Sequence, residues 1–168
     1  MASPKEHLMS WLRDAHAMEK QAIASTEDQL KRLEHYPEFR AWVQDHVDSA
    51  QRQRDAIRGC IERNGGNVST IKDAVMSVTG KFQEMTGMVM TDEVLKNAIG
   101  DYAFKYYEIA SYTSLGSAAD AAGDAETRRV ADDNRAEEEA LAERLAKLIP
   151  DLTREYLSRD AASEPAKR

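Results

Sequence analysis

Three stretches of the chain carry apolar residues at the alternating three- and four-residue spacing of an amphipathic α-helix, and carboxylates interrupt each stretch near its middle. A glutamate that faces a helical core must be protonated, paired or bound to a cation, because an isolated buried carboxylate is too costly. The pattern therefore predicts a helical bundle with one polar site shared between helices. The three inward stripes are Leu8, Leu12, Ala15, Glu19, Ala22, Thr26, Leu30 and Leu33; then Val94, Ala98, Asp101, Lys105, Glu108, Tyr112, Leu115 and Ala119; and finally Thr127, Val130, Asn134, Glu138, Leu141, Leu145 and Leu148.

Composition restricts the class of protein. A chain of 168 residues is enough for one domain with a real core. The net charge of −7 argues against binding nucleic acid, and no apolar run approaches the ~20 residues of a membrane span. Cys60 is the only cysteine, so no disulfide forms within the chain, and the first residues carry no apolar leader. We therefore expect a cytoplasmic protein with no nucleic-acid or membrane partner, and no small-molecule substrate can be identified.

Capping and breaking residues set the expected helix ends. A capping box at Ser3 to Glu6 begins a helix that we expect to reach His35, and Pro37 begins a second that ends before the glycines at 65–66. A third helix is expected over 91–122 and a fourth over 125–149, with Pro150 as its break and one or two further turns up to 157. Residues 1–157 are then one helical domain, and 158–168 form a polar C-terminal tail that we expect to be frayed.

The order of these helices predicts the fold class. Short links join the first helix to the second and the third to the fourth, so each pair is an antiparallel hairpin. Residues 67–90 connect the hairpins and contain a predicted short helix over about 69–85. The expected fold is therefore all-α: a ferritin-like antiparallel four-helix bundle with a long crossover that carries a short fifth helix.

Carboxylates at one level of such a bundle are the ligands of di-iron and di-manganese centres. Candidate metal ligands are Glu19, Glu108 and Glu138, with Asp48 and Gln53 from the second helix and His16 one turn before Glu19. Oxygen-rich sites of this kind suit iron, manganese or zinc. For each candidate there is a plainer interpretation, since an acidic run such as 137–139 usually faces solvent and a glutamine can simply hydrogen-bond across the core.

Lys105 supports a different interpretation of the same residues. It lies one turn from Glu108 on the same face, where an ammonium group can neutralise carboxylates without any metal. It would also repel a cluster of two cations.

Three segments resemble the YciE/YciF-like family of ferritin-like bacterial stress proteins, whose biochemical function is unsettled. They are residues 12–21 (LRDAHAMEKQ), 107–112 (YEIASY) and 137–140 (EEEA). The resemblance extends from about residue 5 to about 157 and implies an antiparallel four-helix bundle with a short fifth helix, often a dimer. Glu19, Glu108 and Glu138 match the family's candidate metal positions. The chain departs from the family pattern at Asp48-Ser49, where the family has paired glutamates, and at Lys105-Tyr106, where it has Glu-His.

Two hypotheses for function stay open. In the first, the chain is a ferritin-like stress-associated protein with a degenerate carboxylate site that binds iron or another divalent metal. In the second, it is a non-catalytic, metal-free helical dimer, a structural or interaction module in which Lys105 neutralises the core carboxylates. Both include a homodimer, because Met9, Trp11, Met18 and Ile23 form a second apolar set on the first helix that needs a cover.

Overall fold

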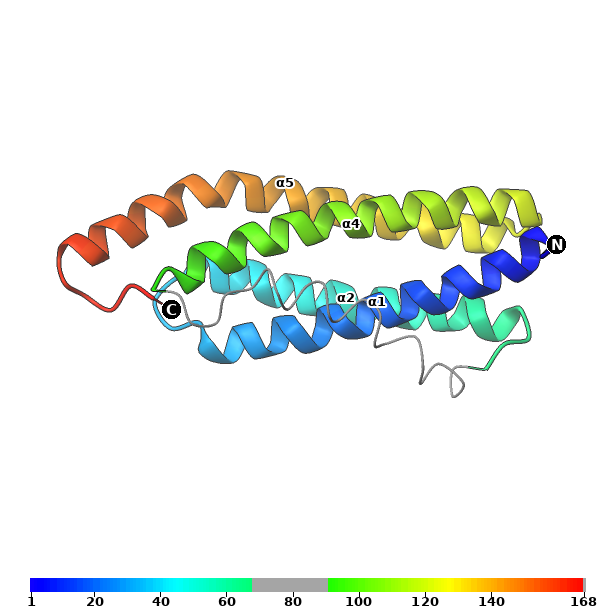
Figure 1. Cartoon of the computed structure of the whole chain (residues 1–168), viewed down its shortest axis with the longest axis horizontal. Coiled ribbons are helices and arrows are strands. Elements are labelled where there is room, and N and C mark those ends of the chain that lie inside the picture. Colours follow the sequence, from blue (N-terminus) through cyan, green and yellow to red (C-terminus); the bar gives the residue numbers. More distant parts are fainter. Residues whose placement is uncertain (68–90, 168) are drawn as a thin grey trace.

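The computed structural model describes residues 1–67 and 91–167, and every regular element in these two ranges is an α-helix. The helices are α1 (Pro4–Arg32), α2 (Pro37–Arg63), α4 (Glu93–Ala122) and α5 (Ala125–Ala161). They run side by side along the long axis of the molecule (Figure 1). α1 packs on α2 and α4, and α5 packs on α4 and α2, so the four helices form a bundle. The predicted all-α class is confirmed for the described residues.

Most helix ends follow from the local sequence. The Ser3 side chain accepts a hydrogen bond from the backbone N–H of Glu6 while the Glu6 carboxylate accepts from the N–H of Ser3, which is the predicted capping box. Gly123 ends α4 with φ 72°, a left-handed conformation that glycine adopts at little cost. Asp124 then caps α5 by accepting from the N–H of Thr127.

The predicted break at Pro150 is wrong, because α5 continues through this proline to Ala161. Pro150 lies on the exposed side of the helix, where water can satisfy the carbonyl that loses its intrahelical partner. Two residues further along, the Leu152 side chain is only 5% exposed within the core. Burial of the residues that follow the proline therefore outweighs its local cost.

The C-terminal segment is docked rather than frayed. The hydroxyl of Tyr36 donates a hydrogen bond to the carbonyl of Ala166, and the backbone N–H of Val94 donates to the carbonyl of Lys167 at 3.1 Å. The first N–H groups of any helix lack partners within the helix. The tail supplies one for α4, which explains why a polar end is nevertheless ordered.

The predicted crossover helix over 69–85 lies outside the described residues. None of the helices in 1–67 and 91–167 has the length and apolarity needed to span a bilayer.

Two apolar clusters fill the bundle. One gathers residues such as Leu8, Leu12, Ile57, Ile61 and Leu115, and the other gathers Tyr36, Phe39, Trp42, Leu145 and Leu152. On α2 and α5 the buried polar residues His46, Ser49, Asn134 and Glu138 fall between the stretches that contribute to the two clusters. The fold thus places a polar layer between two apolar ones.

Candidate functional site

The polar layer, which we call the core layer, takes side chains from all four helices. Glu19, Lys105, Glu108 and Glu138 are 0% exposed, and His46 and Gln53 are 1% exposed. Each belongs to an inward helical stripe whose apolar members fix its direction, as for Glu19 between Ala15 and Ala22 on α1. The sequence prediction that Glu19, Glu108, Glu138 and Gln53 face one core is therefore confirmed, while their role as metal ligands stays a prediction.

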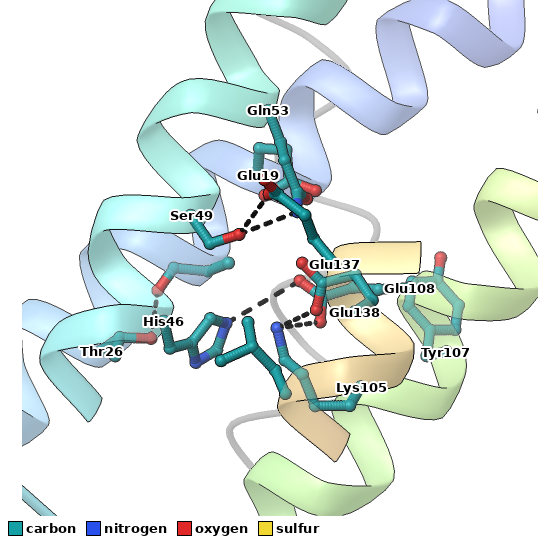
Figure 2. Close-up of polar contacts among 12 residues, drawn as sticks. Glu19, Thr26, His46, Ser49, Gln53, Lys105, Tyr107, Glu108, Glu137 and Glu138 are labelled. Carbon is teal, nitrogen blue, oxygen red and sulfur yellow. Dashed lines mark hydrogen bonds and ion pairs between the residues drawn. The ribbon is translucent and has the colours of Figure 1, made fainter. Parts of the chain in front are cut away.

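The ammonium group of Lys105 lies between two of these carboxylates. Its Nζ is 2.6 Å from Glu108 Oε2 and also contacts Glu138 Oε2 (Figure 2). The two carboxylates raise the pKa of Lys105 although burial acts in the opposite direction. Lys105 is therefore a fully buried cation that pairs α4 with α5.

Glu19 occupies the α1 side of the layer. The Tyr112 hydroxyl donates a hydrogen bond to Glu19 Oε1 at 2.6 Å, while Glu19 Oε2 has no hydrogen-bond partner among the described residues. Burial, and then the nearby charges of Glu108 and Glu138, raise the pKa of Glu19 well above its ordinary value. The fold therefore favours the neutral, protonated form of the Glu19 carboxyl group.

The remaining groups of the layer lower its charge further. Burial, with repulsion from the Glu108 charge, raises the pKa of Glu138 to about 7. Burial and the Lys105 charge hold the pKa of His46 well below its ordinary value, so its imidazole is neutral, with Nε2 3.9 Å from Glu108 Oε1. Lys105 and the raised pKa values of the glutamates thus reduce the negative charge of the layer.

A short chain of hydrogen bonds joins the layer to the surface between α2 and α5. Gln53 Nε2 donates to Ser49 Oγ at 2.9 Å and to Glu137 Oε2 at 3.0 Å, and the Ser49 hydroxyl donates to the same Glu137 oxygen at 2.8 Å (Figure 2). Gln53 Oε1 is buried and without a hydrogen-bond partner among the described residues. Gln53 is therefore held by the hydrogen bonds of its amide nitrogen, while its amide oxygen stays buried.

Two predicted ligands lie elsewhere. Asp48 is exposed, and its carboxylate accepts a hydrogen bond from Gln44 on the surface of α2. His16 is buried, and after burial the charges that lower its pKa are those of Lys20 and Arg54 rather than of the core layer. The structure does not bring either residue to the carboxylates, because the helical period turns each of them to another side of its helix.

The sequence placed Tyr112 in an inward stripe but did not predict its hydrogen bond to Glu19. The signal was present, since Tyr112 follows Glu108 by four residues in the same inward stripe and a buried hydroxyl requires a partner.

The donor set does not fit a dinuclear metal centre. The part of α2 that faces the layer offers His46, Ser49 and Gln53 in place of carboxylates, and the Lys105 ammonium fills the space between Glu108 and Glu138. Among the residues that the structure describes, no group of three His, Cys, Asp or Glu side chains is arranged to hold a metal ion. Several buried atoms still lack hydrogen-bond partners there, including Glu19 Oε2, Glu138 Oε1 and both nitrogens of His46.

A family model described as a domain of unknown function (DUF892) matches residues 3–158. A solved structure of a protein from Xanthomonas campestris pv. campestris is similar to this chain with a TM-score of 0.79 and 32% sequence identity, covering 95% of this chain and 99% of that one.

Two further solved structures share the fold at lower identity. The E. coli stress protein YciF aligns with a TM-score of 0.76 and 17% identity over 90% of this chain and 97% of its own. YcfI from Rhodopseudomonas palustris aligns with a TM-score of 0.67 and 19% identity over 87% of this chain and 94% of its own.

Proposed function

The chain belongs to the YciE/YciF-like family of DUF892 proteins, and from that premise and the core geometry we propose that it is a ferritin-like bundle that acts as a non-catalytic structural or interaction module. The core carboxylates, which in a carboxylate-bridged bundle would hold metal ions, are here neutralised by Lys105 and by protons. A role in the response to stress, by analogy with the likeness to YciF, belongs to the same proposal.

One observation carries this proposal: the Lys105 ammonium contacts both Glu108 and Glu138 with all three side chains fully buried. A charge of this sign repels a divalent cation beside it, and inside a protein that repulsion is far stronger than in water. The ammonium and a dinuclear cluster thus compete for the same carboxylate oxygens.

A second candidate is a single divalent ion, iron, manganese or zinc, held in the core layer. The observation that favours it is the set of buried atoms without hydrogen-bond partners among the described residues, namely Glu19 Oε2, Glu138 Oε1 and His46 Nε2. Their oxygen and imidazole chemistry suits such an ion.

The test is anaerobic loading with Fe(II), Mn(II) or Zn(II), followed by desalting and elemental analysis. We expect the wild type to retain less than about a tenth of an equivalent and its melting temperature to be unchanged by metal, because a preorganised site would couple metal binding to stability. One retained equivalent with a raised melting temperature would overturn the metal-free proposal and establish the second candidate.

The variant Lys105→Gln tests whether the ammonium group prevents metal binding. Its matched control is Lys20→Gln, on the exposed side of α1. Removing the ammonium should let the carboxylates take up a divalent ion, so metal should raise the melting temperature of Lys105→Gln but not that of Lys20→Gln. The wild-type measurement decides between the candidates even where Lys105→Gln fails to fold.

A further inference from the structure

A groove lies between α1 and α4 on the outside of the bundle. Its volume is about 330 Å³, which is within the range of small-molecule binding sites. Trp11, Asp14 and Met18 of α1 line one wall, and Tyr107 and Ser111 of α4 line the other. Of the described residues that line the groove, Asp14 alone is charged. The groove therefore presents one carboxylate between otherwise uncharged walls.

Two exposed aromatic side chains border the groove. Trp11 is 42% exposed and Tyr107 is 46% exposed. Each ring contacts another ring of its own helix: the Trp11 ring centre is 5.7 Å from that of His7, and the Tyr107 ring stacks on Phe104 at 5.9 Å. These contacts hold both aromatic faces in position before a ligand binds, which reduces the entropy lost on binding.

The pairing of α1 with α4 places Asp14 between the two aromatic rings along the groove. The two helices run in opposite directions (Figure 1), and the hydrogen bond from Tyr112 to Glu19 fixes their register. Tyr107 precedes Tyr112 on α4, so it lies toward the part of α1 that follows Glu19. Trp11 and Asp14 both precede Glu19 on α1, with Trp11 the farther of the two. The order along the groove is therefore Trp11, Asp14 and Tyr107.

Asp14 and Ser111 both offer acceptor atoms to a ligand. Burial raises the pKa of Asp14, with no opposing charge or hydrogen bond from another described residue. The Ser111 hydroxyl donates its proton to the carbonyl of Tyr107 at 2.8 Å, so its oxygen is left as an acceptor. A ligand that carries a positive charge and donates hydrogen bonds would satisfy both groups.

We propose that this groove, which we call the α1–α4 groove, binds a small organic ammonium ion with an aromatic or alkyl body. The ammonium group pairs with Asp14 beside the Trp11 ring, whose face attracts cations, and the apolar body lies between the helices toward Tyr107. An anion would be repelled by Asp14, and a metal ion such as Ca²⁺ needs more oxygen ligands than one carboxylate supplies.

The position and the charge of the protein both suit this ligand. The net charge of −7 attracts small cations from solution. The α1–α4 groove shares none of its described lining residues with the core layer. The proposal therefore goes beyond the proposed function and is tested separately from it.

The groove also changes the interpretation of the second apolar set on α1, whose pattern predicted a second chain as its cover. Met18 and Ile23 are 1% and 9% exposed, because both belong to the apolar core of the bundle. Trp11 remains exposed, and it borders the groove. This set does not by itself require a second chain as its cover, and the homodimer stays a prediction.

The first experiment is an NMR titration of the full chain with 2-phenylethylammonium, with 2-phenylethanol and 3-phenylpropionate as neutral and anionic analogues. Trp42 is an internal control, because it is fully buried and donates its indole N–H to the carbonyl of Leu141. We expect the ammonium to shift the indole signal of Trp11, which Trp11→Phe assigns, and to leave that of Trp42 in place.

The affinities decide the chemistry of the groove. We expect a dissociation constant of about 1 mM or lower for the ammonium, affinity at least about threefold weaker for the alcohol, and no binding of the carboxylate. The absence of a Trp11 shift at about 10 mM ammonium, or equal affinities for the ammonium and the alcohol, would overturn the proposal.

The variant Asp14→Asn tests the charge pair. It should weaken binding of the ammonium at least about threefold and leave that of the alcohol unchanged. Asp28→Asn is the matched control on the same helix, since 64% of the Asp28 side chain is exposed. Equal effects of the two substitutions would mean a general effect of charge. A change in the mass measured by light scattering, without a change in ammonium binding, would mean a contact between chains; either result overturns the proposal.

Discussion

Two polar clusters of this bundle shift the pKa of a carboxylate in opposite directions. At the turn between α4 and α5, Asp124 accepts hydrogen bonds from Thr127 N, Thr127 Oγ1, Arg63 Nη2 and Asn64 Nδ2 at 2.6–3.0 Å. Although burial alone would raise it, these bonds and the Arg63 charge hold the pKa of Asp124 far below its usual range. In the core layer the glutamates have few donors, and their pKa values are raised.

The comparison teaches that a carboxylate in this protein keeps its charge where several donors outweigh burial, and that burial raises its pKa where donors are few. The Asp124 cluster is a satisfied network that fastens α2 to the α4–α5 turn. The core layer is a network with unsatisfied polar atoms, and its charge balance depends on Lys105. Loss of a single partner there should therefore lower the stability of the protein far more.

The largest effect is expected from Lys105→Met. Removing the ammonium leaves Glu108 and Glu138 buried without a counter-charge, which should lower the free energy of unfolding by about 3–5 kcal/mol. Urea denaturation measures the change. The variant Lys105→Met/Glu108→Gln/Glu138→Gln should recover most of the loss, because it removes the charges together. A single variant as stable as the wild type would contradict the view that the layer depends on charge pairing.

Asp124→Ala should cost less, about 2 kcal/mol, because it removes a helix cap together with hydrogen bonds to Arg63 and Asn64. Asp124→Asn keeps acceptor capacity for the cap and should cost about half as much. Asp133→Ala is the surface control, since the exposed ion pair of Asp133 with Arg129 contributes little. If Asp124→Ala and Asp133→Ala gave equal losses, the Asp124 cluster would not be a fastening point.

The helices and the core glutamates could be predicted from the sequence, because both follow from the same helical periodicity of apolar residues. Leu12, Ala15 and Ala22 fix the direction of Glu19, and the capping residues fix the starts of α1 and α5. The unbroken course of α5 through Pro150 could not be predicted in this way, since it depends on tertiary burial of Leu152. Local signals alone favoured a break there.

The candidate site was predicted in outline but not in its contacts. The period placed Lys105 near Glu108, yet the contact with Glu138 depends on how α5 packs against α4. Asp48 and His16 were included for their chemistry and their level along the helices, and the rotation of each helix sends them elsewhere. The sequence predicts the level of a side chain along the bundle more easily than it predicts which neighbouring helix that side chain contacts.

The protonation of the core layer should appear in the pH dependence of stability. A carboxyl group whose pKa is raised on folding stabilises the native state most below the unfolded value, and this contribution is lost as pH rises through the folded value. Glu138 titrates at about 7, and the pKa of Glu19 is raised well above its ordinary value by burial. The free energy of unfolding should therefore fall between about pH 6.5 and 7.5 by on the order of 1 kcal/mol per unit.

The chosen range separates this effect from others. His46, with its depressed pKa, affects stability only below about pH 6.5, and the Asp124 cluster only at still lower pH. Asp101, raised by burial to about 7, contributes equally to the wild type and to Glu19→Gln. Glu19→Gln should flatten the fall in stability with pH, because it removes a carboxyl group whose pKa is raised by burial. A variant with the wild-type slope would show that Glu19 is already ionised in the folded protein.

The smallest effect, about 1 kcal/mol, is expected from Tyr112→Phe, which removes the only hydrogen bond that Glu19 accepts among the described residues. While Glu19 is protonated, the loss is that of a bond between neutral groups. Once Glu19 loses its proton, its bond to a hydroxyl strengthens, so the cost of Tyr112→Phe should increase as pH rises. Urea denaturation at pH 6.5 and 8.5 measures this, with Tyr107→Phe on the exposed side of α4 as the control. A cost independent of pH would mean that Glu19 does not change its charge, and the core layer would then resemble the Asp124 cluster more than its raised pKa values indicate.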